Sequence, residues 1–227
     1  MRGLITLNRG KGLLVALAIG TAALFATGGG ASAEGGTAEL LQALRQGGHV
    51  IYIRHPRTNW DETDERDRPN WWRHCGEGHR DLSDEGRQDA RLIGDAIRTL
   101  EVPVGKVLSS EYCRAVETAK LAFGEGNFTT EFDITGVGAF MTVDPENGGP
   151  RLIEATRRRL AEVPEPGKNI VLISHIHKEP GPVAEKVFSE IVEGEAAVFR
   201  PDGNGAYTLA GRLKVEDWAA LLEAGKN

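Results

Sequence analysis

Short apolar runs alternate along the chain with longer amphipathic stretches. Three short runs, the apolar runs 50–53 and 170–173 and the run 106–108 that begins with a lysine, predict buried strands because each is too short for a helix and leads into polar residues. Helical periodicity predicts helices over the following stretches: 37–46, 112–123, 150–161 and 215–222. Two further runs, 196–199 and 206–213, flank a Pro-Asp-Gly-Asn-Gly turn and predict a hairpin.

The order of these elements predicts the class of fold. Ser83, followed by two acidic residues, is expected to cap one more helix, which ends before Pro103. The segment 128–134 alternates weakly and is expected to add a strand. Strands that alternate with helices indicate an α/β domain, a three-layer α/β/α sandwich with a mainly parallel central sheet.

The stretch 59–82 is long, polar and without periodicity. Loops of this length inside a compact domain are usually functional or disordered. Its tryptophans, Trp60, Trp71 and Trp72, are expected to pack the loop onto the domain, with a lid or substrate rim as the alternative.

The first 33 residues have the pattern of a secretory signal peptide. Basic residues come first, the apolar stretch 12–26 follows, and an Ala-Ser-Ala cleavage pattern ends at Ala33. Cleavage there leaves a domain of residues 34–227, secreted or periplasmic and without stable membrane insertion. An uncleaved N-terminal anchor is the alternative, although the apolar stretch is short for a membrane span.

The charge balance excludes some classes of partner. The whole chain has 27 Lys and Arg and 33 Asp and Glu. The signal peptide holds three of the basic residues and none of the acidic ones, so the mature chain has 24 against 33, a net charge of −9. This acidic balance argues against binding to nucleic acid or to an anionic membrane.

The chain has two cysteines, Cys75 and Cys113. Export to an oxidising compartment favours a disulfide between them, with two free thiols as the alternative. Their spacing does not decide, because bridging requires Cα atoms within about 7 Å of each other. A bridge would join the loop to the start of the helix that carries Arg114.

Polar residues follow the predicted strands at their carboxyl ends. Arg54 and His55 follow the first strand, His175 follows the strand 170–173, and a third strand leads into the helix with Arg114. In an open α/β sheet, ligands bind at this edge. Two arginines and two histidines can therefore converge there, a composition that suits a phosphoryl group and a nucleophilic imidazole.

Four segments carry a resemblance to a known family. They are the strand ending in Arg54-His55 and the segments DLSDEGRQDARLIGDAI, VLSSEYCRAVETAKLAFG and NIVLISH. In this order they resemble branch 1 of the histidine phosphatase superfamily over residues 49–213, a superfamily that includes phosphoglycerate mutases, acid phosphatases and phosphoprotein phosphatases. The hairpin EGEAAVFRPDG and the cysteine pair look like an exported bacterial subgroup of small histidine phosphatases. The resemblance implies a phosphoglycerate mutase-like fold.

The resemblance also implies roles for individual residues. His55 matches the nucleophile that attacks phosphorus and forms a phosphohistidine. Arg54 and Arg114 would bind phosphoryl oxygens and lower the pKa of His55 by like-charge repulsion, and His175 would donate to another phosphoryl oxygen. No metal or cofactor is implied. The expected function is a metal-independent phosphomonoesterase, a phosphoric monoester hydrolase with a small phosphorylated substrate.

Three features depart from the pattern of the family. Ser174 precedes His175 and Ile176 follows it, where glycine often follows. Pro56 stands where glycine is common after the nucleophile, and it removes a backbone N–H. The general acid has no recognisable motif, with Glu131, Asp133 and Glu179 as candidates. A missing acid leaves a non-catalytic phospholigand-binding module of the same fold as one alternative, and a phosphomutase is another.

Other polar residues allow more than one interpretation. Arg57 and Arg80 are candidates for substrate binding at the rim of the site, with surface ion pairs as the alternative. His175 and His177 could share one strand face as ligands in a metal-dependent hydrolase, a weak signal without carboxylate or Cys partners. The loop residue His79 is expected to be solvated.

Overall fold

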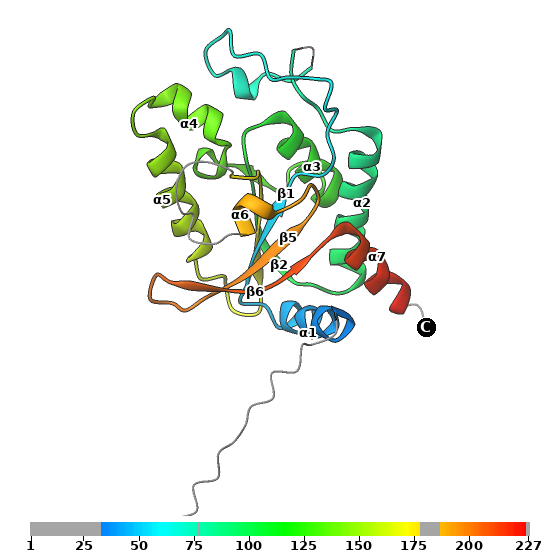
Figure 1. Ribbon diagram of the computed structural model, residues 1–227. Helices are drawn as coiled ribbons and strands as arrows, with labels where there is room; N and C mark the ends of the chain where they lie inside the picture. Colours follow the sequence, from blue (N-terminus) through cyan, green and yellow to red (C-terminus); the bar gives the residue numbers. More distant parts are fainter. Residues whose placement is uncertain (1–32, 77, 178–186, 226–227) are drawn as a thin grey trace, which may run out of the picture. The chain divides into compact units, whose positions relative to one another are not determined.

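A six-stranded sheet lies at the centre of the fold (Figure 1). Its strands are β1 (Val50–Arg54), β2 (Val104–Ser109), β3 (Thr129–Thr130), β4 (Asn169–Ser174), β5 (Ala196–Pro201) and β6 (Tyr207–Leu213), in the order β3-β2-β4-β1-β5-β6. The pairs β1/β4, β2/β4 and β2/β3 are parallel, and β1/β5 and β5/β6 are antiparallel. The predicted mainly parallel sheet is confirmed, with the predicted hairpin at one edge.

The computed structural model describes residues 33–76, 78–177 and 187–225. The predicted signal peptide, apart from Ala33, lies outside the described residues, and so does the candidate acid Glu179. All the described elements belong to one compact unit. Within these ranges, no helix is both long enough and apolar enough to cross a membrane.

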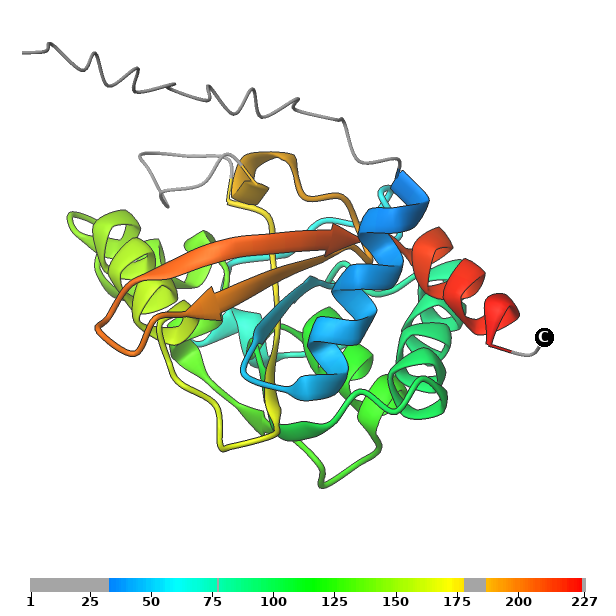
Figure 2. The same cartoon turned by 90° about the horizontal axis from the view of Figure 1, so that it is seen from below.

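Helices cover both faces of the sheet (Figures 1 and 2). They are α1 (Ala33–Gln46), α2 (Asp84–Thr99), α3 (Cys113–Phe123), α4 (Val137–Val143), α5 (Gly148–Leu160), α6 (Val187–Glu190) and α7 (Val215–Ala224). One core cluster joins the sheet to α1, α2, α3 and α7, and a second joins its other face to α5 and α6. The predicted three-layer sandwich is therefore confirmed.

The strand β1 shows why its sequence is apolar without interruption. Ile51 and Ile53 point into the first core cluster, and Val50 and Tyr52 point into the second. Successive side chains of a strand alternate between the faces of a sheet, so a strand covered on both sides must be apolar at every position. The same burial pattern holds for β4.

Local signals predicted several helix ends correctly. The Ser83 hydroxyl accepts a hydrogen bond from the Gly86 N–H at 3.1 Å and caps α2, as expected. The helix α3 ends at Gly124, whose φ of 88° is one that a side chain disfavours.

The expected strand 128–134 is wrong over most of its length. Only Thr129–Thr130 pairs in the sheet, and a 3-10 turn follows at Phe132–Ile134. Alternate residues of a strand share one face, whereas Phe132 packs with α4 and α5 and Ile134 enters the core of the sheet. A straight strand could not direct the two side chains to these separate clusters.

The short helix α4 was not predicted from the sequence. Its residues, VGAFMTV, include a glycine and β-branched side chains, which have low helix propensity. Ala139 and Phe140 are nevertheless buried, and α4 packs against α5. Tertiary packing therefore stabilises this helix.

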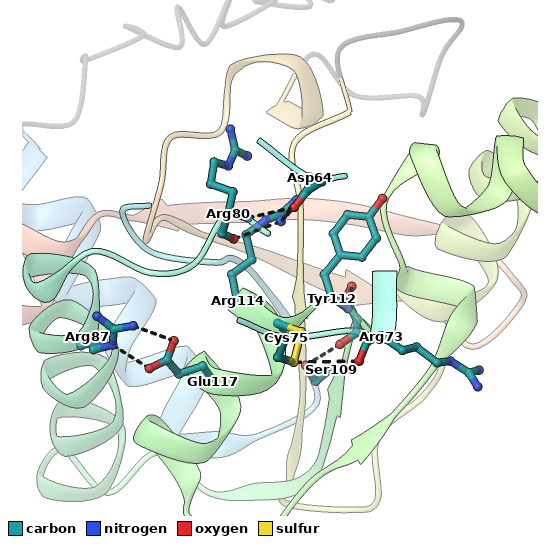
Figure 3. Close-up of a disulfide and its surroundings, with 11 residues drawn as sticks. Asp64, Arg73, Cys75, Arg80, Arg87, Ser109, Tyr112, Arg114 and Glu117 are labelled. Carbon is teal, nitrogen blue, oxygen red and sulfur yellow. Dashed lines mark hydrogen bonds and ion pairs between the residues drawn. A yellow bond between two sulfur atoms is a disulfide. The ribbon is translucent and has the colours of Figure 1, made fainter. Parts of the chain in front are cut away.

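A disulfide joins Cys75 to Cys113, with the two Cα atoms 5.5 Å apart (Figure 3). It links the loop 59–82 to the first residue of α3, directly before Arg114. Trp71 and Trp72 of the loop are buried against Tyr112. The predicted disulfide is confirmed, as is the packing role of these two tryptophans.

We expect the double variant Cys75→Ser/Cys113→Ser to lose about 4 kcal/mol of free energy of unfolding. The bridge spans a sequence separation of 38 residues and restricts the unfolded chain. Urea denaturation of the oxidised wild type and the variant measures the loss. A reducing agent should destabilise the wild type by a similar amount and leave the variant unchanged. Equal free energies for the two oxidised proteins would contradict this expectation.

Candidate active site

Three parallel strands bring their carboxyl ends together at one edge of the sheet. Arg54 pairs in register with Ser174, and the His55 N–H donates to the Ser174 carbonyl at 3.0 Å. On the other side of β4, the Ser110 N–H donates to the Ile173 carbonyl at 2.8 Å. The residues that follow β1, β2 and β4 therefore lie side by side.

The imidazole of His55 is buried and held in one orientation. Its Nδ1 lies 2.9 Å from the Pro56 carbonyl oxygen, an acceptor, so Nδ1 carries the proton. Its Nε2 accepts from the Arg114 Nε–H at 3.3 Å. Both contacts assign the same tautomer, with the free electron pair on Nε2. The carbonyl of Pro56 thus orients the ring even though proline contributes no N–H.

The surroundings of His55 keep its ring neutral. Burial lowers the pKa of His55 well below its usual value, and the positive charges of Arg114 and Arg54 lower it further. The sequence predicted repulsion by the arginines, and the structure adds burial as the larger cause. A neutral imidazole is the form in which Nε2 can act as a nucleophile.

The second pocket histidine, His175, lies beside His55, with ring centroids 5.2 Å apart. Its Nε2 is 2.7 Å from the Ser110 hydroxyl, which also accepts from the Tyr112 N–H. Burial, and then the charge of Arg114, lower the pKa of His175 well below its usual value. The His175 Nδ1 is buried without a hydrogen-bond partner among the described residues. When the Ser110 hydroxyl donates its hydrogen bond to Nε2, the ring proton of His175 is on Nδ1. This N–H is then a free donor in the site.

Two arginines flank the histidines. Arg54 donates from Nη1 to the Ile191 carbonyl at 2.9 Å and lies 3.4 Å from Glu193, and its buried Nε has no partner within the described chain. The guanidinium of Arg114 packs over the Tyr112 ring at 4.6 Å. Both side chains are almost fully buried, so their positions are defined before any ligand binds.

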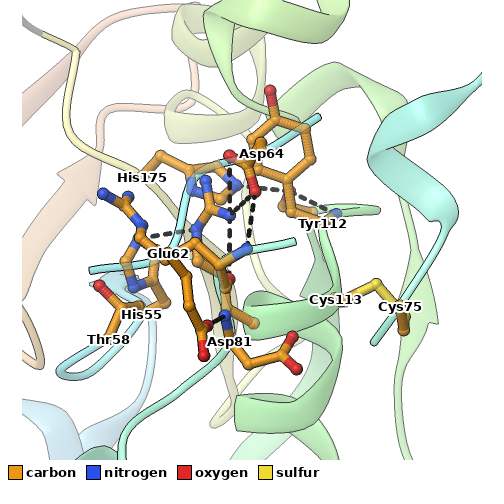
Figure 4. A network of polar contacts seen from close by, with 12 residues as sticks. His55, Thr58, Glu62, Asp64, Cys75, Asp81, Tyr112, Cys113 and His175 are labelled. Carbon is orange, nitrogen blue, oxygen red and sulfur yellow. Dashed lines mark hydrogen bonds and ion pairs between the residues drawn. A yellow bond between two sulfur atoms is a disulfide. The ribbon is translucent and has the colours of Figure 1, made fainter. Parts of the chain in front are cut away.

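These residues open onto a cavity of about 510 Å³ (Figure 4). Its lining includes the four predicted catalytic residues, and also Arg80, Trp60, Glu62, Thr63, Asp64, Arg66, Tyr112, Gly136, Val137, Gly138 and Ile176. The guanidinium of Arg80 lies 4.5 Å over the exposed Trp60 ring. The structure therefore places Arg80 at the predicted rim, together with one tryptophan of the loop.

Arg57 was predicted as a second rim residue, and the structure places it elsewhere. Its guanidinium donates to both oxygens of Asp89 on α2, at 2.8 and 2.9 Å, and it does not line the cavity. The chain turns at Pro56, and Gly86 of α2 packs against the Arg57 carbonyl, where a Cβ would clash at 2.0 Å. This close packing directs the Arg57 side chain along α2, so the alternative of a surface ion pair is what the structure shows.

The two described candidates for the general acid also lie outside the cavity lining. Glu131 pairs with Arg159 at 2.9 Å, and Asp133 pairs with Arg158 at 2.8 Å. Both arginines belong to α5, which packs against the 3-10 turn at Phe132–Ile134. Their ion pairs with α5 hold these carboxylates away from His55.

His79 differs from what the sequence suggested, because it is buried rather than solvated. The Nε2 of His177 lies 3.0 Å from the Tyr52 hydroxyl, and burial lowers the pKa of His177 to about 4. In the part of the chain that the structure describes, no three His, Cys, Asp or Glu side chains are grouped so as to hold a metal ion. The prediction that no metal takes part stays a prediction.

Sequence reasoning missed two contributors to the site, Asp64 and Ser110. Ser110 comes directly after β2, just as His175 comes directly after β4. Its position at the carboxyl end of a strand could therefore have identified it as a residue of the site. Asp64 lies in an acidic stretch of the loop 59–82, where the length of the loop was the only indication of function.

One family model matches part of the chain. The sequence model of the histidine phosphatase superfamily (branch 1) matches residues 50–134. The matched segment contains Arg54, His55 and Arg114 and stops before β4 and His175. No curated protein matches the chain.

Solved structures give low similarities. The protein histidine phosphatase SixA complexed with tungstate is 18% identical, with a TM-score of 0.45, and 74% of this chain and 98% of that chain are covered. The alpha-ribazole phosphatase from Shigella flexneri is 18% identical, with a TM-score of 0.46 and coverage of 71% and 94%. A phosphoserine phosphatase mutant from Entamoeba histolytica, in complex with phosphoserine, is 13% identical, with a TM-score of 0.45 and coverage of 74% and 98%. At such identities, the roles of residues rest on the geometry of this site.

Proposed function

We propose that this protein is a metal-independent phosphomonoesterase that acts through a phosphohistidine on His55. The observation that carries the proposal is the buried, neutral imidazole whose Nε2 faces Arg114 in the cavity. The match of residues 50–134 to the histidine phosphatase superfamily supports the reaction class. A small phosphorylated substrate suits a cavity of about 510 Å³.

The cavity supplies the donors that a phosphoryl group requires. The guanidinium of Arg114 and the unpartnered Nε–H of Arg54 can each donate to a phosphoryl oxygen, and His175 can donate from Nδ1. Each preorganised donor that strengthens as charge develops in the transition state contributes about 2.7–4 kcal/mol. Arg80 adds positive charge at the rim.

The reaction then proceeds in two displacements. The electron pair on His55 Nε2 attacks phosphorus, the bond to the ester oxygen breaks, and the alcohol leaves with a proton. Water next attacks the phosphohistidine, the bond between nitrogen and phosphorus breaks, and inorganic phosphate forms while Nε2 regains its electron pair. Throughout, Nδ1 keeps its proton and donates it in the hydrogen bond to the Pro56 carbonyl.

We also propose that the protein works in the periplasm or outside the cell. The signal-peptide pattern of residues 1–33 supports this location, and the disulfide between Cys75 and Cys113 is compatible with an oxidising compartment.

One observation favours a second candidate, a non-catalytic phospholigand-binding module. Glu131 and Asp133, the described candidates for the general acid, pair with α5 instead of lining the cavity. A site with Arg54, Arg114 and His175 but without a proton donor would bind a phosphoryl group and release alcohols slowly.

Hydrolysis of p-nitrophenyl phosphate in the presence of EDTA tests the proposed function. We expect turnover by the mature protein and, after a rapid quench with labelled substrate, a phosphoenzyme that is stable in base and labile in acid. Turnover that EDTA abolishes would point to a metal-dependent hydrolase. Binding of inorganic phosphate by folded protein without turnover would support the binding module instead.

A further inference from the structure

The carboxylates that line the cavity in the described chain are Glu62 and Asp64, and they differ in their surroundings. Both oxygens of Glu62 accept from the loop itself, from the Asn59 amide at 3.1 Å and from the Asp81 N–H at 2.9 Å. Asp64 instead reaches across to α3. Its two oxygens lie 3.1 and 3.2 Å from Arg114 Nη1 (Figure 4).

Asp64 is held close to the nucleophile. Its Oδ1 also accepts from the Arg80 N–H at 3.2 Å, and its side chain is only 15% exposed. The guanidinium of Arg114 donates to Asp64 through Nη1 and to His55 through Nε. One arginine therefore connects the carboxylate of the loop with the nitrogen that attacks phosphorus.

A bound phosphoryl group must compete with Asp64 for Arg114. Arg114 offers its Nη1–H to either the carboxylate or a phosphoryl oxygen, and the dianionic group is the stronger acceptor. Once displaced, the carboxyl group faces a phosphoryl dianion instead of a guanidinium, and a neighbouring negative charge favours the protonated form. Substrate binding would thus convert Asp64 from the partner of Arg114 into a proton donor.

The direction of approach places Asp64 on the side of the leaving group. His55 reaches the cavity from the end of β1, whereas Asp64 reaches it from the loop 59–82 (Figure 4). In a phosphoryl transfer the attacking and leaving atoms lie roughly in line with phosphorus. The leaving oxygen therefore points away from His55, and the carboxylates that line the cavity in the described chain both come from the loop 59–82.

We propose that Asp64 is the general acid of this site, and this inference rests on the proposed function. As substrate binds and displaces it from Arg114, the Asp64 carboxylate takes up a proton from solvent. In the first step, His55 Nε2 bonds to phosphorus, and the electron pair of the breaking ester bond takes this proton from the Asp64 carboxyl group. In the second step, the Asp64 carboxylate takes a proton from the attacking water, whose oxygen bonds to phosphorus as Nε2 leaves. Phosphate departs, and Asp64 releases its proton to solvent as it returns to Arg114.

The dependence of the rate on the leaving group tests this role. We expect Asp64→Asn to lower kcat/KM for an alkyl phosphate about 100-fold, and for p-nitrophenyl phosphate less than about tenfold, because nitrophenolate leaves without a proton. Asp61→Asn is the matched control, since it removes the same charge from an exposed position of the same loop outside the cavity lining. It should leave both rates unchanged.

Other results would overturn the role of Asp64. Equal losses on both substrates would make Asp64 a positioning residue for Arg114. If Asp64→Asn turned over both substrates faster and bound inorganic phosphate more tightly, Asp64 would instead be a residue that competes with phosphate for the anion site. A leaving-group effect in Glu62→Gln but not in Asp64→Asn would transfer the role to Glu62. The wild-type phosphoenzyme separates these results from failure of the proposed function, because it forms with p-nitrophenyl phosphate whether or not Asp64 is the acid.

Discussion

The variant His55→Asn is expected to lower kcat for p-nitrophenyl phosphate by about four to six orders of magnitude. The asparagine amide can keep the hydrogen bond that His55 Nδ1 makes to the Pro56 carbonyl, but it has no atom in place of Nε2. The hydrogen bond to Pro56 and the nearby fold are thus retained while the nucleophile is lost. Steady-state kinetics gives the loss, and the labelled phosphoenzyme should disappear as well.

A histidine just before the same strand provides the control for this variant. His49 precedes β1 at the opposite end, is equally buried, and has its Nδ1 2.9 Å from the Gly47 carbonyl oxygen. We expect His49→Asn to keep its activity because it lies far from the cavity lining. Folded His55→Asn should still bind inorganic phosphate through Arg54, Arg114 and His175. Substantial turnover by His55→Asn would contradict a covalent role for His55.

The variant Arg114→Met is expected to lower kcat/KM about 1000-fold, because it removes a buried cation from the lining of the cavity where we propose that the phosphoryl group binds. The variant should also change the dependence of the rate on pH, because Arg114 acts on the protonation of His55. Burial and then Arg114 lower the pKa of His55, so removing Arg114 lets that pKa rise. More of the imidazole is then protonated in mildly acidic solution. The acidic limb of the profile of kcat/KM against pH should therefore move to higher pH.

Arg87→Met is the matched control for Arg114→Met. Arg87 pairs with Glu117 between α2 and α3 at 2.7 Å, partly exposed and away from the cavity lining (Figure 3). It should leave both kcat/KM and the acidic limb unchanged. An acidic limb that stays in place in Arg114→Met would show that this arginine does not act on the protonation of His55.

The strand ends were predictable because the signal for them is local. An uninterrupted apolar run reports burial on both faces of a sheet, and the polar residue that follows it marks the edge where ligands bind. This reasoning located Arg54, His55 and His175 without any knowledge of the strand order. The strand order β2-β4-β1 then brought Ser110 and Arg114 to the same edge.

Side chains that do not directly follow an apolar strand were positioned by contacts with distant segments of the chain. Arg57 is two residues from His55, yet it pairs with Asp89 because α2 packs against the backbone there. The carboxylates Glu131 and Asp133 lie in the segment where an acid was expected, yet the arginines of α5 hold them outside the cavity lining. Proximity along the chain was a poor guide wherever a helix from a distant segment supplied the partner.

By itself, the sequence determined the layered α/β architecture, the positions of most strands and helices, and the residues delivered by two strand ends. Each of these follows from periodicity and from turn residues that act over a few positions. Only the tertiary structure decided that Asp64 meets Arg114 beside His55, since the loop 59–82 has no periodicity to fix it. The disulfide to Cys113 and the burial of Trp71 and Trp72 set the course of that loop. Both are contacts between residues far apart in the chain.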